Sequence, residues 1–443
     1  MERLSSQAYP LPEAILKALD AGYTTFALTL IDAWLERDDI PAFLRERLQL
    51  EKVLAKRRLS HYIYSYDEAE ALLATRFAKY RKGMLDSFIA QGLLDWAYVD
   101  GQLRLEERLI DNAAKRCPVL KEEEGEDPDL RKRDDFVALL KERGRLTADI
   151  TTRLTFTITD SSLAGRLARV NLPLPKAVEG RQEVVSLDFS PAVLSVDGED
   201  APMRTVLFEK RLTGGDEFTM TAHYRLTECR RPFPQEEYVA PGMEAYLKEE
   251  APHILFTPAL RSLAHEITAG CTGMRAKAEA IYDWITSHIL YSFVRPYSTI
   301  DCISEYAASS LKGDCGIQAM LFITLCRIAG VPAAWESGWY VTDCEAGSHD
   351  WARINISGQW FPVDCSFGGG AFRQGKEERR RHYFGQLDCM RMIVNSTTGA
   401  ILTGKTAYPR DPTDNQRGEA EVDGQTLLEG FDVKPEVLSY SLS

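Results

Sequence analysis

One of the nine cysteines stands at the start of an apolar helical pattern. Cys315 lies in the sequence GDCG, and apolar residues recur at helical spacing from Ile317 to Ile328, before Gly330 and Pro332 end the pattern. A thiol at a helix N-terminus lies beside unpaired N–H groups and the positive end of the helix dipole, which favour the thiolate. The backbone N–H of Cys315 can also face a developing oxyanion. The position therefore predicts a nucleophile.

A predicted hairpin follows this helix. Residues 349–366 read HDWARINISGQWFPVDCS, two extended runs joined by a Ser-Gly turn. Pairing Ile356 with Gln359 places His349 and Asp364 on one face as diagonal neighbours, roughly 7–8 Å apart, within reach of a side-chain hydrogen bond. We expect the other face to pack on a core, because its residues are all apolar: Ala352, Ile354, Ile356, Phe361 and Val363.

The three side chains match three chemical roles. A thiol needs a base to ionise at neutral pH, and the base needs a partner that fixes its tautomer and orientation. Taken singly, a packed cysteine, a surface histidine and a turn aspartate are the commoner interpretations. The combination of GDCG before a helix with H-x-W, a hairpin and W-x-P-V-D is far more specific than any one of them.

These motifs together resemble the transglutaminase-like superfamily, whose core carries a cysteine at a helix start, a histidine near an aromatic residue and an aspartate on the following strand. The segments GVPAAWESGW and HYFGQLD are also similar to bacterial members. The resemblance covers about residues 245–395 and implies a papain-like fold. Carried over by position, it implies Cys315 as nucleophile, His349 as base and Asp364 as the residue that orients the base.

Other candidate residues carry weaker signals. Trp335 and Trp351 could wall an acyl-binding groove, although packing is the commoner role of such residues. No CxxC pair or DxDxDG loop occurs, so we expect neither a metal site nor a cofactor. The odd number and irregular spacing of the cysteines do not suggest a disulfide framework. The sequence does not identify a side chain that completes an oxyanion hole.

The periodicity divides the chain into four parts and predicts an α+β protein. Residues 1–145 show helical spacing, interrupted by a hairpin pattern at Trp96–Leu105. Residues 146–235 alternate with period two and predict a β-sandwich. Residues 236–405 hold the papain-like core that the resemblance implies, and residues 406–443 read as a loosely ordered tail with one short strand.

Charge and hydropathy exclude some partners. The 443 residues carry a formal net charge of −13, with a sequence pI of about 5.2, and lack the basic face of a nucleic-acid binder. An anionic membrane surface is disfavoured for the same reason. The first residues do not match a signal peptide, and no run of 18 apolar residues occurs, so we expect a cytoplasmic protein.

The resemblance implies thiol-dependent acyl transfer on a protein or peptide substrate. Cys315 would form a thioester at a peptide or carboxamide carbonyl, which water or an amine then resolves. The first outcome describes a protease or amidase and the second a transglutaminase, and we expect hydrolysis. The alternative is an inactive transglutaminase-like module that binds or scaffolds. Neither the substrate nor the oligomeric state follows from the sequence.

Overall fold

The computed structural model describes residues 9–121, 129–407, 409–411 and 413–443. It mixes helices and strands, as expected for an α+β chain. Helix α13 (Cys315–Ile328) is buried from Cys315 to Arg327, in keeping with a sequence that is apolar on almost every side. This helix packs against a four-stranded antiparallel sheet of order β14-β13-β12-β15. Its strands are β12 (Ala333–Val341), β13 (Ala346–Ile356), β14 (Gln359–Val363) and β15 (Arg391–Asn395).

The β13–β14 hairpin has the predicted register. Ile356 pairs with Gln359, and the turn residues Ser357 and Gly358 both have positive φ angles, 55° and 84°, as a type I′ turn requires. The apolar face packs on α13 within one core cluster, as predicted. The pairing stops earlier than expected, because β14 ends at Val363.

Asp364 does not lie on the strand, and that detail of the prediction is wrong. It is the N-cap of helix α14 (Cys365–Arg373), and its Oδ1 accepts a hydrogen bond of 2.9 Å from the N–H of Phe367. An aspartate can satisfy an unpaired N–H group of a first helical turn in this way, which favours ending the strand there.

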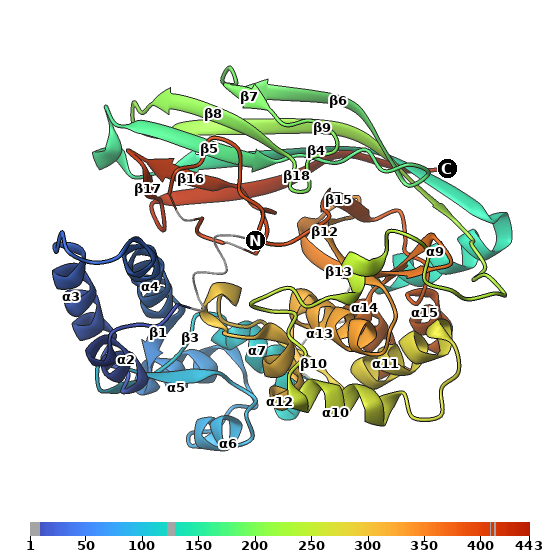
Figure 1. Cartoon of the computed structure of the whole chain (residues 1–443), viewed down its shortest axis with the longest axis horizontal. Coiled ribbons are helices and arrows are strands. Elements are labelled where there is room, and N and C mark those ends of the chain that lie inside the picture. Colours follow the sequence, from blue (N-terminus) through green and yellow to red (C-terminus); the bar gives the residue numbers. More distant parts are fainter. Residues whose placement is uncertain (1–8, 122–128, 408, 412) are drawn as a thin grey trace.

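Further short elements enclose α13 on the side away from the sheet (Figure 1). Strands β10 and β11 form a parallel pair, and this pairing places the segment after β10 beside the start of α13. These elements are η3 (Glu244–Leu247), α10 (Pro258–Ile267), α11 (Met274–His288), β10 (Leu290–Tyr291), η4 (Tyr297–Thr299), α12 (Ile303–Ser310) and β11 (Lys312–Gly313). Helix α15 (Glu377–His382) packs instead on α14 and on α9 (Asp129–Arg143).

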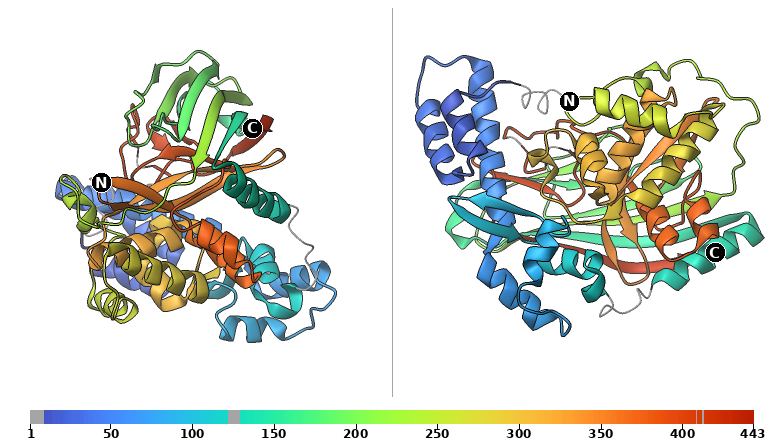
Figure 2. Two further views of the ribbon diagram at one scale, coloured as in Figure 1. Left: turned by 90° about the vertical axis from the view of Figure 1, so that its right-hand side faces the viewer. Right: turned by 90° about the horizontal axis from the view of Figure 1, so that it is seen from below.

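Two larger sheets lie above this core and face each other (Figures 1 and 2). Their orders are β18-β4-β9-β6 and β17-β16-β5-β8-β7, and one apolar cluster joins them to the ends of β12 and β15. The strands that fall in the period-two segment are β4 (Arg145–Ile158), β5 (Leu167–Pro173), β6 (Gln182–Ser190), β7 (Ser195–Val196), β8 (Thr205–Arg211) and β9 (Asp216–Cys229), with the short helix η2 (Ser161–Leu163) between β4 and β5.

The C-terminal residues complete these two sheets, so the prediction of a loose tail is wrong. The strands are β16 (Glu419–Val422), β17 (Gln425–Thr426) and β18 (Phe431–Leu442). β18 pairs antiparallel with β4 along most of its length, and the ring of Phe431 stacks on Phe156 at 4.9 Å. The pattern is hard to recognise in the sequence because polar residues and a proline separate its few apolar ones.

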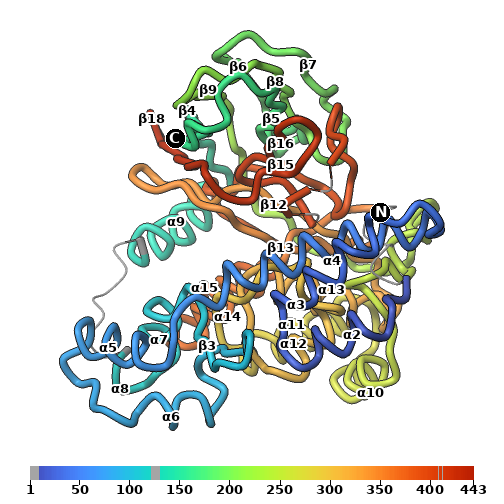
Figure 3. Tube along the Cα trace, turned by 90° about the vertical axis from the view of Figure 1, so that its left-hand side faces the viewer, coloured from blue at the N-terminus to red at the C-terminus, as the bar shows by residue number. Residues whose placement is uncertain are grey.

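The N-terminal residues form mainly helices, as expected (Figure 3), together with a small sheet of order β1-β3-β2. The predicted hairpin is confirmed, with Val99 paired to Gln102 across Asp100 and Gly101. Helix α4 contacts η4 of the core. The elements are α2 (Glu13–Asp20), α3 (Thr24–Leu35), α4 (Ala42–His61), β1 (Tyr62–Ser65), α5 (Tyr66–Arg76), α6 (Met84–Ala90), β2 (Trp96–Val99), β3 (Gln102–Glu106), α7 (Leu109–Arg116), α8 (Pro118–Lys121) and α9 (Asp129–Arg143). Of the helices in the described residues, none has both the length and the apolar character to span a membrane.

Removing residues 431–443 should lower the free energy of unfolding by at least about 3 kcal/mol, the usual cost of losing one buried aromatic contact. The deletion exposes β4 and leaves Phe156 without its stacking partner. Chemical denaturation monitored by circular dichroism measures the change. Lys434→Ala, at an exposed side chain of the same strand, is the control and should stay within about 0.5 kcal/mol of the parent. A truncated protein as stable as the parent would contradict the strand's role.

Candidate active site

The start of α13 is a tight junction that only small residues permit. Asp314 is the N-cap, and its Oδ1 accepts a hydrogen bond of 3.2 Å from the N–H of Ile317. A Cβ on Gly316 would lie 2.2 Å from the hydroxyl oxygen of Tyr297 and 2.7 Å from Asp350 Oδ2. The GDCG sequence therefore lets the nucleophile candidate approach the neighbouring segments closely.

The Cys315 thiol donates its hydrogen bond to Asp350. Sγ lies 3.3 Å from Asp350 Oδ2, and the other carboxylate oxygen accepts a hydrogen bond from the amide of Gln416. The same amide also donates to the backbone carbonyl of His349, at 3.1 Å. A side chain from the C-terminal segment thus holds the carboxyl group that faces the thiol.

The surroundings of Cys315 disfavour the thiolate, contrary to the expectation from the helix terminus alone. Burial raises the pKa of the Cys315 thiol well above its usual value, and the carboxyl groups of Asp350 and Asp314 raise it further. Burial, Asp414 and Asp314 likewise raise the pKa of Asp350. The helix terminus is present, but adjacent acids oppose it, so this arrangement favours a protonated thiol.

His349 and Asp364 form the pair that the sequence predicts. His349 Nε2 lies 2.8 Å from Asp364 Oδ2, and both side chains are buried. Arg391 donates to the same oxygen from Nη2 at 3.0 Å. Burial would raise the pKa of Asp364, but His349, Arg391 and the N–H of Phe367 lower it well below its usual range. Asp364 is therefore an anion that holds the imidazole in place.

The ring of His349 is neutral in this setting. Burial lowers its pKa, and the charge of Arg391 lowers it further, although Asp364 acts in the opposite direction. A neutral ring that donates from Nε2 to a carboxylate carries its lone pair on Nδ1. Within the part of the chain that the structure describes, Nδ1 has no hydrogen-bond partner. The histidine is therefore equipped to accept a proton.

Cys315 and His349 are not joined by a hydrogen bond in the described residues, where the thiol donates to Asp350. The alternation of β13 explains this contact, since successive side chains point to opposite faces of a strand. Asp350 shares the face of Ala352, which packs on α13, whereas His349 lies with Trp351, its ring centroids 6.0 Å away. The structure thus brings together two pairs, Cys315 with Asp350 and His349 with Asp364.

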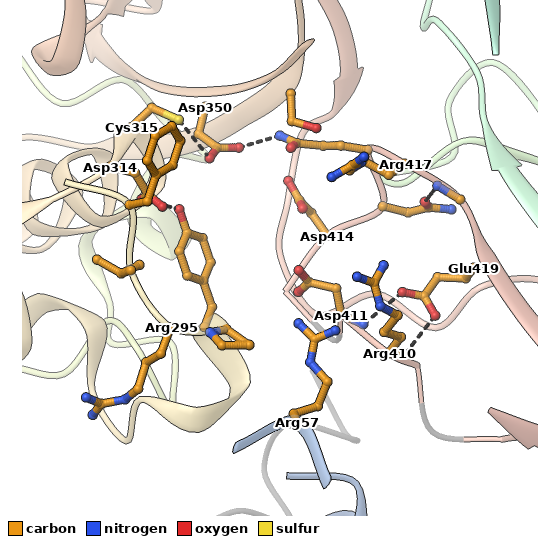
Figure 4. Close-up of a pocket in the computed structure, with 18 of the residues that line it drawn as sticks. Arg57, Arg295, Asp314, Cys315, Asp350, Arg410, Asp411, Asp414, Arg417 and Glu419 are labelled. Atoms are coloured by element: carbon orange, nitrogen blue, oxygen red, sulfur yellow. Dashed lines mark hydrogen bonds between the residues drawn. The ribbon is translucent and has the colours of Figure 1, made fainter. Parts of the chain in front are cut away.

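The thiol opens into a cavity of about 280 Å³ whose walls come from distant parts of the chain (Figure 4). Its lining includes Tyr297 and Asp350 of the core, Arg57 of α4 and residues 410–411 and 414–419 of the C-terminal segment. The cavity is strongly charged, with four arginines and five acids among its lining residues.

The two tryptophans proposed for substrate binding do not reach this cavity. Trp335 and Trp351 are buried, and neither is among the described residues that line the space around Cys315. Trp351 donates from Nε1 to Glu336 at 2.8 Å, and Trp335 belongs to the core around α13. Both positions are explained by packing, so the binding-groove prediction is wrong for this cavity.

Two residues of the site could not be assigned from local sequence. Arg391 had one signal, since it is the single charge within the apolar run CMRMIV, and a buried arginine there needs an acidic partner. Gln416 had none, because it reaches Asp350 from 66 residues away. The described residues contain no group of three or more His, Cys, Asp or Glu side chains placed to hold a metal ion.

A match to a family model supports the resemblance predicted from the sequence. Residues 261–365 match the transglutaminase-like superfamily, a range that contains Cys315, His349 and Asp364. A candidate cysteine protease from Cytophaga hutchinsonii is similar in structure at 15% identity and a TM-score of 0.43, over 67% of this chain and 91% of that one. The periplasmic domain of TgpA from Pseudomonas aeruginosa is similar at 13% identity and a TM-score of 0.28, over 55% of this chain and 95% of that domain. No curated protein matches the sequence.

Gly316→Ala should destabilise the protein by about 1–3 kcal/mol, because the added methyl group overlaps Tyr297 and Asp350. Thermal unfolding followed by calorimetry measures the loss. Gly370→Ala is the matched control, since a Cβ there meets nothing within 4 Å and alanine favours a helix. Equal melting temperatures for the two variants would show that the junction at Cys315 is not tightly packed.

Asp350→Asn should lower the pKa of the Cys315 thiol, because it removes one of the carboxyl groups that raise it. The rate of iodoacetamide alkylation at Cys315, followed by mass spectrometry across a range of pH, should then reach its midpoint at lower pH. Asp188→Asn, at an exposed carboxylate in β6, serves as the control and should leave the profile unchanged. An unchanged or raised midpoint in Asp350→Asn would refute the electrostatic role.

Proposed function

Residues 261–365 form a transglutaminase-like domain, and we propose that it acts as a cysteine enzyme that cleaves or transfers acyl groups through Cys315. The observation that carries the proposal is the buried His349–Asp364 pair, whose side chains are 2.8 Å apart. His349 is the neighbour in sequence of Asp350, which contacts the Cys315 thiol at the start of α13. A neutral imidazole fixed by an aspartate is the usual means of activating a nucleophile in an acyl-transfer site.

The chemistry needs one rearrangement. The Cys315 thiol must part from Asp350 and reach His349 Nδ1, which takes the proton. The thiolate then attacks a peptide or carboxamide carbonyl, and the backbone N–H of Cys315 is placed to donate to the oxyanion. The C–N bond breaks as the imidazolium gives its proton to the leaving nitrogen, which leaves a thioester on Cys315.

The second half-reaction decides between hydrolysis and transfer. Attack of water on the thioester, with His349 again as base, releases an acid and restores the thiol. Attack of an amine gives a new amide instead. We propose hydrolysis of a protein or peptide substrate as the main reaction, because the cavity at Cys315 is lined by charged and polar groups that water can reach.

A second candidate is an inactive domain that only binds other molecules. The contact between Cys315 and Asp350 favours it, because a thiol that donates to a carboxyl group and has a raised pKa is a poor nucleophile at rest. The two candidates differ in whether Cys315 can carry an acyl group.

Treatment with p-nitrophenyl acetate tests the choice. We expect an acetyl group on Cys315, seen by mass spectrometry, and a burst of p-nitrophenol. His349→Ala should slow acylation by about 10²–10⁴-fold, the range for loss of a general base. The exposed Cys344 is the control thiol, and its acetylation should not depend on His349. Cys315 acetylated no faster than Cys344, with or without His349, would leave the binding domain as the answer. Added hydroxylamine, as an amine acceptor, then compares transfer with hydrolysis.

A further inference from the structure

Arginine side chains from two distant segments meet in the wall of the Cys315 cavity. Arg57 comes from helix α4 of the N-terminal region, and Arg410 and Arg417 come from the C-terminal segment. Figure 4 shows these three on the side of the cavity formed by that segment, while the fourth lining arginine, Arg295, points away. Neither segment belongs to the transglutaminase-like match, so the family resemblance does not account for this wall.

These three guanidinium groups have no polar partner among the described residues, although Arg410 lies over the ring of Phe431 at 5.0 Å. In the described residues, none of them makes a hydrogen bond or an ion pair, and the buried Nε atoms of Arg57 and Arg410 are both unsatisfied. Burial lowers the pKa of Arg57 and of Arg417, and the charge of Arg410 lowers both further, although Asp411 and Glu419 act in the opposite direction on Arg57. Positive groups that repel one another and lack acceptors are stabilised by an anion placed between them.

The acids of the cavity already accept hydrogen bonds from other groups. Glu419 accepts from Lys405 at 2.9 Å and from the N–H groups of Arg410 and Asp411, at 2.7 and 2.8 Å. Asp411 itself accepts from the N–H of Thr413 at 3.1 Å.

The remaining acids are nearer the thiol and are also occupied. Asp414 accepts from Ser337, and burial raises its pKa to about 7. Burial raises the pKa of Asp314 to about 6, although Tyr297 and the N–H of Ile317 donate to it. The cavity therefore has guanidinium donors without acceptors, whereas each of its acids already accepts at least one hydrogen bond.

We propose that Arg57, Arg410 and Arg417 form an anion-binding subsite that holds a carboxylate of the acyl substrate beside Cys315. The inference rests on the proposed function and narrows its substrate to peptides or amides with an acidic group near the scissile carbonyl. It also gives the N-terminal helical region a role, since α4 supplies one of the three cations.

Paired alkylating reagents test the subsite. Iodoacetate and iodoacetamide both form a sulfur–carbon bond with the thiolate and release iodide, but only iodoacetate carries a carboxylate. The rate with iodoacetate is divided by the rate with iodoacetamide at Cys315, and this ratio is divided by the same ratio for glutathione. The result should exceed one in the wild type. Arg57→Gln or Arg417→Gln should lower it about fivefold, as expected for losing one close charge pair in a wet site.

Two variants separate a built subsite from general charge attraction. Arg295→Gln removes the same charge from the cavity lining, but Arg295 donates from Nε to Thr299 and lies over Tyr306, so it should leave the ratio unchanged. Arg57→Lys keeps the charge and should keep most of the effect. A wild-type ratio equal to that of glutathione, or an equal fall in Arg295→Gln, overturns the proposal.

Equilibrium binding gives an answer that does not depend on thiol chemistry. Calorimetry on Cys315→Ala should show tighter binding of a peptide with an internal glutamate than of its glutamine analogue. A peptide with a free C-terminus and its amide form the second pair, which identifies the source of the carboxylate. Equal affinities within both pairs refute the subsite, even if Cys315 of the wild type is acylated. Tighter binding of the carboxylate peptides without acylation of the wild type supports the subsite and refutes the enzyme.

Discussion

Helix α13 is buried along almost its whole length against β12 and β13, and this packing fixes where its first residue lies. The apolar face of β13 holds the helix, so the polar residue that continues this face, Asp350, meets Cys315. His349 then lies on the opposite face, where Asp364 and Arg391 hold it. The arrangement of both pairs thus follows from one helix–sheet contact and the two-residue period of a strand.

Local patterns carried enough information to predict the centre of the fold. The Ser357-Gly358 turn and the apolar residues around it fix the β13–β14 register, because a shift by one residue would expose the whole core face. The C-terminal strands were missed for the opposite reason. The apolar side chains of β18 are few and separated by polar ones, and the strand pairs with β4, which lies far away in the sequence.

The candidate site was also predictable only in part. Cys315, His349 and Asp364 could be found because each lies in a recognisable local motif, and the His349–Asp364 contact follows from hairpin parity. Asp350 was not predicted as the partner of the Cys315 thiol. The alternation of side chains along the strand does place Asp350 on the face of β13 that packs on α13. Gln416 and Arg57 lie far from the motifs, and only tertiary folding brings them to the cavity.

The segment that forms one wall of the cavity connects β15 to β16, so it comes later in the sequence than the other described residues that line the cavity. A nascent chain that has completed α13 and the β13–β14 hairpin has its thiol and imidazole but not Gln416 or the arginines from residues 410–417. During synthesis, the residues with reactive side chains therefore precede the segment that forms the cavity wall beside them. The protein acquires the wall of its cavity only once residues 410–411 and 414–419 have been synthesised and have packed against the core.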